Sequence, residues 1–165
     1  MNKYKLIQSV VFLFIGLFLV RLIGLPANFT PIIAVAVFLP RIIKNTYLAM
    51  LFVIAVMMLT DLMLGLYDGM LWTYLLLALF SFFGGLQKNL YLTGIVSVLA
   101  WHLVINFFVF ISGHGTLSLA MTYAQAIPFD ARLLFSTILF LASFDYSQRY
   151  LENLPWHNLK NILSN

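Results

Sequence analysis

Apolar residues occur along this chain in long runs, separated by short breaks at proline, glycine and charged positions. A helix needs about 20 mostly apolar residues to cross a hydrocarbon core of about 30 Å, and most of the runs approach that length. The pattern predicts an all-α membrane protein, a single transmembrane domain over 1–165 built as a bundle of about six transmembrane helices. The helices are expected at 6–25, 31–44, 46–64, 70–83, 90–111 and 133–150.

Local signals mark some of the breaks between these helices. Thr30 is a favourable N-cap residue and Pro31 suits a first helical turn, so the second helix is expected to begin there. Between the fifth and sixth helices, the segment 116–127 is apolar but interrupted by three polar side chains. It is too short and too polar to span, and we expect a short loop helix that lies at the interface or folds back over the bundle.

The positions of lysine and arginine orient the predicted helices, because cytoplasmic loops collect these residues. Only Arg21 and Arg132 fall on the opposite side. We therefore expect a multi-pass protein of the bacterial cytoplasmic (inner) membrane, with both termini in the cytoplasm and with Asp68, His114 and Asp130 outside. The residues assigned to the cytoplasmic side are Lys3, Lys5, Arg41, Lys44, Lys88, Arg149 and Lys160.

Composition agrees with a lipid environment and excludes several classes of function. The chain is 63% hydrophobic and 8% charged, whereas an ordinary soluble domain is roughly half apolar and about a quarter charged. The absence of cysteine excludes thiolate nucleophiles, cysteine-based metal sites and disulfides. The net charge of +4 is dispersed and forms no basic run, so we expect the lipid bilayer and no nucleic acid as a partner.

No motif of a known catalytic site occurs in the sequence. It contains no Gly-x-Ser-x-Gly, no His-Glu-x-x-His, no phosphate loop and no paired acids at a useful spacing. We therefore expect no enzyme, no catalytic residue, no cofactor and no metal. His114, between two glycines of an outer loop, could serve as a metal ligand, although a solvated loop residue is the more common role.

Charged and polar residues inside the predicted helices carry most of the functional information, because such residues are costly in a bilayer and usually mark a site. Arg21, Asp61 and Asn106 lie in the three helices that run outward, each about 24 Å from its cytoplasmic start at about 1.5 Å per residue. His102 lies one turn below Asn106 on the same helix face. These four residues either form a ligand-binding cluster, or Arg21 and Asp61 form a structural ion pair with Asn106 as an interhelical hydrogen bond.

Four short motifs occur along the chain: Pro26-Ala27-Asn28-Phe29-Thr30-Pro31, Thr60-Asp61-x-x-x-Gly65-x-Tyr67, Asn106-Phe107 and Ala126-x-Pro128-Phe129. With these motifs, nearly the whole chain resembles a family of small bacterial membrane proteins of unknown function that carries an Asn-Phe-Thr-Pro element. That family is similar in size and topology to the substrate-binding S components of energy-coupling factor transporters.

This resemblance implies a substrate-binding component that takes up a vitamin or related micronutrient from the outer side, with a transmembrane coupling subunit and ATPases as its partner. Two positions depart from the pattern: the first helix lacks the Ala-x-x-x-Ala face that docks the coupling subunit, and Thr137 stands where the smaller family often has an acid. The alternative function is a non-transporting membrane scaffold of a cell-envelope assembly. The predicted ligand-binding residues are Arg21, Asn28, Thr30, Asp61, Tyr67, His102 and Asn106.

Overall fold

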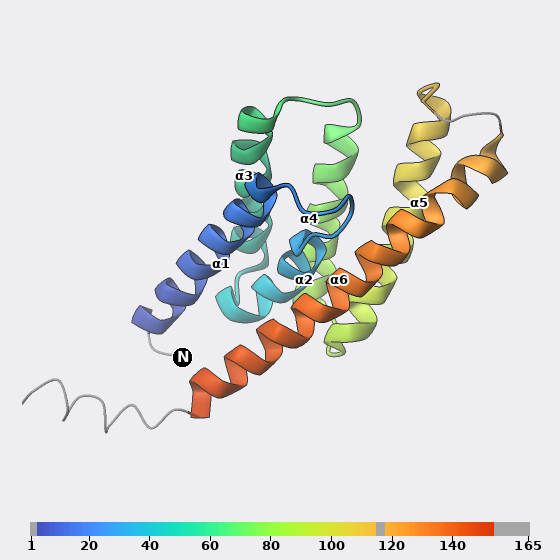
Figure 1. Ribbon diagram of the computed structural model, residues 1–165. Helices are drawn as coiled ribbons and strands as arrows, with labels where there is room; N and C mark the ends of the chain where they lie inside the picture. Colours follow the sequence, from blue (N-terminus) through green and yellow to red (C-terminus); the bar gives the residue numbers. More distant parts are fainter. Residues whose placement is uncertain (1–2, 115–117, 154–165) are drawn as a thin grey trace, which may run out of the picture.

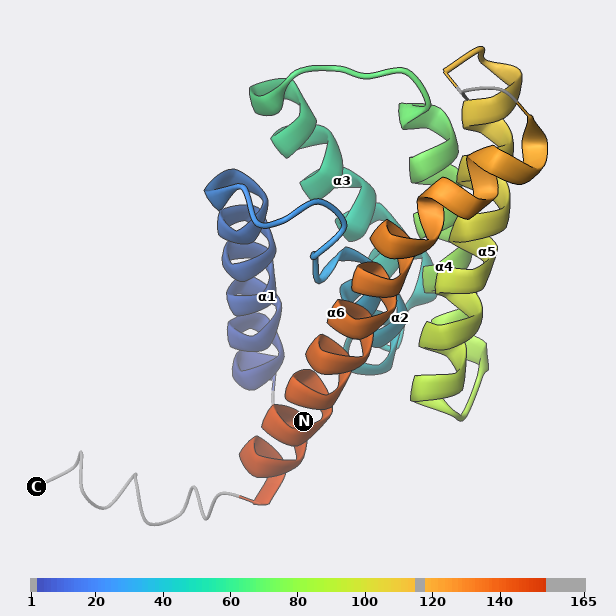
Figure 2. The same cartoon turned by 45° about the vertical axis from the view of Figure 1, so that its right-hand side comes forward.

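The computed structural model describes residues 3–114 and 118–153, and this part of the chain is entirely helical, without a strand. Figure 1 and Figure 2 show the helices packed as one bundle, with α6 running diagonally across it in both views. Lys160, which we used to orient the helices, lies outside the described residues. The helices are α1 (Lys3–Ile23), α2 (Ile32–Ile43), α3 (Thr46–Leu64), α4 (Met70–Leu86), α5 (Leu90–Ile111) and α6 (Leu119–Asn153).

The predicted bounds of the third and fifth helices, 46–64 and 90–111, are confirmed. Asparagine explains both starts, since a side-chain oxygen at the N-cap satisfies a backbone N–H of the first turn. Asn45 accepts from the Leu48 N–H at 3.0 Å, and Asn89 accepts from the Leu92 N–H at 3.0 Å. The first, second and fourth helices differ from prediction by a few residues at their ends.

The predicted separate loop helix at 116–127 is wrong, as is the sixth helix limited to 133–150. The described part of that segment, from Leu119 onward, forms the first turns of α6, which continues without a break to Asn153. Pro128 lies inside this helix, where it lacks an N–H for the helical ladder. The helix continues past Pro128 because α6 packs along α5, more extensively than any other pair of described helices. Asp130 and Arg132 therefore belong to a helix and not to a loop.

Helix α2 is the centre of the bundle and contacts each of the other five described helices. Every residue from Ile32 to Leu39 is buried. Gly84 of α4 allows the closest approach, because a Cβ at this position would lie 2.4 Å from the Val37 carbonyl oxygen. At the other end, the Arg41 guanidinium donates to the carbonyls of Gln87 at 2.8 Å and of Lys88 at 3.2 Å. This contact fixes the C-terminal end of α2 beside the turn between α4 and α5.

The surface is apolar and the interior holds much of the polar chemistry. Exposed positions on α3, α4 and α5 are mainly Leu, Ile, Met, Phe and Tyr, while Thr60, Asp61, Ser97, Asn106 and Asp130 are buried. This distribution suits a lipid environment, because large exposed apolar surfaces are rare on soluble monomers. Three helices among the described residues are long and apolar enough to cross a membrane, namely Thr46–Leu64, Leu90–Ile111 and Leu119–Tyr150.

Candidate functional site

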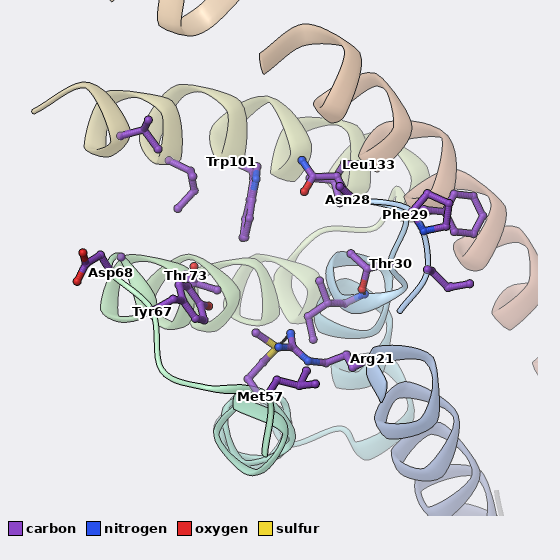
Figure 3. A pocket seen from close by; sticks show the side chains of 18 of the residues that line it. Arg21, Asn28, Phe29, Thr30, Met57, Tyr67, Asp68, Thr73, Trp101 and Leu133 are labelled. Carbon is purple, nitrogen blue, oxygen red and sulfur yellow. Dashed lines mark hydrogen bonds between the residues drawn. The ribbon is translucent and has the colours of Figure 1, made fainter. Parts of the chain in front are cut away.

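A cavity of about 590 Å³ opens at the end of the bundle opposite Arg41, where α1, α3 and α5 finish. The loop between α1 and α2, residues 24–31, forms one wall, and α5 and the loop between α3 and α4, residues 65–69, form the facing wall (Figure 3). Aromatic and aliphatic side chains make up most of the lining, including Trp101 and Phe108. The polar residues that line it are Arg21, Asn28, Thr30, Tyr67, Asp68, Thr73, Ser112 and His114.

One polar cluster lies between α1, α3 and α4. The Arg21 guanidinium forms an ion pair with Asp61 and donates a second hydrogen bond to the Met57 sulfur at 2.7 Å. The Tyr74 hydroxyl donates to the other carboxylate oxygen of Asp61 at 2.8 Å. Asp61 is buried behind Arg21 and does not line the cavity, whereas Arg21 does. The Arg21 Nε is buried and has no hydrogen-bond partner among the described residues.

A second polar cluster lies between α5, α6 and the loop at 24–31, and Asp130 is its centre. One carboxylate oxygen of Asp130 is 2.7 Å from His102 Nδ1 and accepts from the Asn106 amide at 3.1 Å. The other oxygen accepts from the Asn28 amide at 3.3 Å. Asp130 and Asn106 line a second cavity of about 320 Å³, and this cavity shares Asn28 and Trp101 with the first.

The loop at 24–31 is attached to α6 by hydrogen bonds and ring contacts, and these hold Asn28 between the two cavities. Asn28 has a left-handed backbone, with φ of 64°, a conformation that asparagine tolerates better than most residues. The Ser136 hydroxyl accepts from the Thr30 N–H at 3.3 Å and donates to the Thr30 carbonyl at 3.2 Å. The Phe29 ring packs against Phe140, with centroids 6.0 Å apart. The cavity wall is therefore fixed to α6 at several points.

Loop residues surround the mouth of the larger cavity. Burial raises the pKa of the Tyr67 hydroxyl above its ordinary value, so Tyr67 is protonated and able to donate at neutral pH. His114 lies 2.9 Å from the Ser112 hydroxyl and 3.6 Å from the Asp68 carboxylate, and both His114 and Asp68 are largely exposed. Among the described residues, no three His, Asp or Glu side chains are grouped so that they could hold a metal ion.

The structure divides the predicted ligand-binding residues into two groups. Arg21, Asn28, Thr30 and Tyr67 line the larger cavity, and Asp61 lies directly behind Arg21. His102 and Asn106 belong to the second cluster, which shares no hydrogen bond with the Arg21–Asp61 pair among the described residues. Of the two alternatives, the contacts among the described residues show the Arg21–Asp61 ion pair and an interhelical hydrogen bond from Asn106, in two separate polar clusters. The clusters are separate because α1 packs on α2 and α3 only, among the described helices, whereas α5 packs on α6.

Asp130 is the residue of the candidate site that sequence reasoning missed. Its position two residues after Pro128 suggested an outer loop, yet the structure buries it within α6. One signal could have found it. If residues 119–153 are treated as a single helix despite the proline, Asp130 becomes a lone acid inside an apolar span, and such residues usually have a partner or a function.

Comparison with known proteins identifies one family. The model of a family described as "Family of unknown function (DUF6580)" matches residues 2–154. No curated protein and no solved structure matches the chain.

Proposed function

Because this chain belongs to DUF6580, a family of unknown function, its cavity is the best guide to its role, and we propose that it is a membrane-embedded substrate-binding component for uptake of a vitamin or related micronutrient. The cavity of about 590 Å³ carries this proposal. Small-molecule sites have volumes of about 300–1,000 Å³ and mostly apolar linings with a few placed polar groups. Trp101, Phe108 and the few polar side chains around them fit that description.

We further propose that the chain crosses the bacterial inner membrane six times, with the short α2 and the loop at 24–31 making one crossing together, and that both termini are cytoplasmic. Arg41 and the Lys88 backbone meet at one end of the bundle, while the cavity opens at the other. Since basic residues concentrate on the cytoplasmic side, this arrangement supports a cavity that opens outward. A ligand would enter from outside, between the loops at 24–31 and 65–69.

Uptake requires a source of energy in addition to a binding site. The resemblance to S components favours a transmembrane coupling subunit with ATPases as the partner. The absence of an Ala-x-x-x-Ala face in the first helix implies that any such subunit would dock through different side chains. Co-purification of ATPase subunits with the tagged protein from its own membranes would test this part of the proposal.

Ligand binding can be tested directly with the purified protein. We expect native mass spectrometry in mild detergent to show a retained small molecule, and a panel of vitamins to contain a compound that raises the melting temperature. Trp101→Leu should abolish the shift, because Trp101 lines both cavities. Trp72→Leu is the matched control, since Trp72 lies on α4, packs against Phe108 of α5 and lines neither cavity.

The competing role, a non-transporting scaffold of a cell-envelope assembly, predicts a different result. The Arg21–Asp61 pair would then serve folding alone, and the cavity would bind nothing. Asp61→Asn separates the two roles. A loss of folding yield, together with no melting shift from any vitamin, supports the scaffold. A loss of uptake at normal yield supports the binding component.

A further inference from the structure

The second cavity and the Asp130 cluster are not needed for a pocket that only encloses an apolar molecule. The second cavity measures about 320 Å³, and its lining combines apolar side chains with three amides, the Thr122 hydroxyl, the His114 ring and the Asp130 carboxylate. Asn28 and Trp101 line both cavities, so the two spaces meet at these residues. They are adjacent compartments at the same end of the bundle.

The two compartments differ in the charge that faces them. Arg21 is the half-buried charged group of the larger one, in which Asp68 is exposed, and the Arg21 Nε is buried and unpartnered among the described residues. Asp130 is the buried charged group of the smaller one. A guanidinium N–H binds acceptors such as a carboxylate, whereas a carboxylate binds ammonium groups and other N–H donors. The two compartments therefore select opposite chemical groups.

Asp130 differs from Asp61 in a way that supports a binding role. Both oxygens of Asp61 contact protein donors, and Asp61 lines neither of the two cavities. Asp130 also accepts protein hydrogen bonds, but it borders the smaller cavity, and among the described residues its Oδ1 accepts the long 3.3 Å bond from Asn28. A carboxylate oxygen has two lone pairs, so this oxygen can accept a further donor from a ligand.

Resting on the proposed function, we infer that the two cavities are subsites of one binding site, and that its ligand is an amphoteric aromatic molecule. The acceptor or anionic end lies against Arg21, the N–H donor or cationic end lies against Asp130, and the planar body lies against Trp101. Asn28, which bonds Asp130 and lines both compartments, separates the two ends.

Matched probes of one and two rings test this inference on the purified full-length protein in nanodiscs. The first series is 4-(aminomethyl)benzoate, benzylamine and benzoate. The second is 4′-(aminomethyl)biphenyl-4-carboxylate, 4-(aminomethyl)biphenyl and biphenyl-4-carboxylate. Since a hydrogen bond to a charged group is worth about tenfold or more in affinity, the compound with both groups in the fitting series should bind at least about tenfold more tightly than either one-ended compound.

Two variants assign the ends of the probe. Asp130→Asn should weaken the ammonium compounds by about tenfold and leave the carboxylate-only compound within about twofold. Asp145→Asn is the control, because it makes the same change on α6 at a residue that pairs with Arg149 and lines neither cavity. The double variant Arg21→Gln/Asp61→Asn removes that ion pair without leaving a lone charge, and it should weaken only the carboxylate compounds.

Equal binding of one-ended and two-ended compounds by the wild-type protein would overturn the inference, and this comparison needs no variant to fold. Equal affinity of the ammonium compounds for Asp130→Asn and Asp145→Asn would overturn it as well. If no probe binds while a vitamin raises the melting temperature, the inference fails and the proposed function stands. If neither probes nor vitamins bind, both fail.

Discussion

Gly84→Ala tests how closely α4 must approach the central helix. An added Cβ would lie 2.4 Å from the Val37 carbonyl oxygen, whereas ordinary Cβ contacts begin near 3.4 Å, so the two backbones must separate by about 1 Å. Overpacking of this kind costs about 3 kcal/mol at the upper end of its usual range. The better helix propensity of alanine offsets about 1 kcal/mol of this destabilisation. We expect a net destabilisation of about 2 kcal/mol.

Thermal unfolding of the detergent-solubilised protein measures this effect, and about 2 kcal/mol corresponds to a fall of about 4–8 °C for a chain of this size. Gly16→Ala is the matched control. Gly16 also lies within a helix, α1, but nothing lies within 4 Å of an added Cβ. It should therefore raise stability by about 0.5–1 kcal/mol. Equal melting temperatures for the two variants would refute the packing argument.

Three further predictions concern α6 and the loop attached to it. Asn28→Ala should be less stable than Asn28→Gly by about 1 kcal/mol, because both lose the bond to Asp130 but only alanine is strained at a φ of 64°; equal thermal stability would contradict this. Thr137→Val should stabilise the protein by about 1 kcal/mol, since the buried Thr137 hydroxyl has no partner among the described residues. Ser136→Ala should instead destabilise it by about 1–3 kcal/mol, because it leaves the Thr30 N–H unpaired. Thermal melting of the two variants beside the wild type should show a higher melting temperature for Thr137→Val and a lower one for Ser136→Ala.

The apolar runs predicted the ends of α3 and α5 well, but sequence reasoning failed where a proline stands inside a helix and at the predicted N-cap Thr30, since Pro31 is the N-cap of α2. The starts of α3 and α5 are set locally, because Asn45 and Asn89 each accept a bond from a backbone N–H three residues later. The continuity of α6 through Pro128 depends instead on its contact with α5. That contact is tertiary, and no local pattern encodes it.

The candidate site shows the same distinction between local and tertiary information. Residue counting along each helix gives the height of a side chain in the bundle, and Arg21 and Asn106 do lie toward the end where the cavities open. It does not give the neighbours of a helix. Arg21 pairs with Asp61 because α1 packs on α3. Asn106 donates a hydrogen bond to Asp130 because α5 packs on α6. The larger cavity could be located from the loops, but its division into two compartments could not.

The length of the central helix sets the depth of the larger cavity. At about 1.5 Å per residue, the 12 residues of α2 span about 18 Å, and the 22 residues of α5 span about 33 Å. Arg41 holds the C-terminal end of α2 beside the turn before α5. The difference in length between the two helices therefore lies at the N-terminal end of α2, where Ile32 and the loop at 24–31 line the cavity. One additional turn there would fill about 5 Å of that space. Under the proposed function, a relative could therefore accept a smaller or larger ligand by adding or removing a single turn of this helix, without a change in the rest of the bundle.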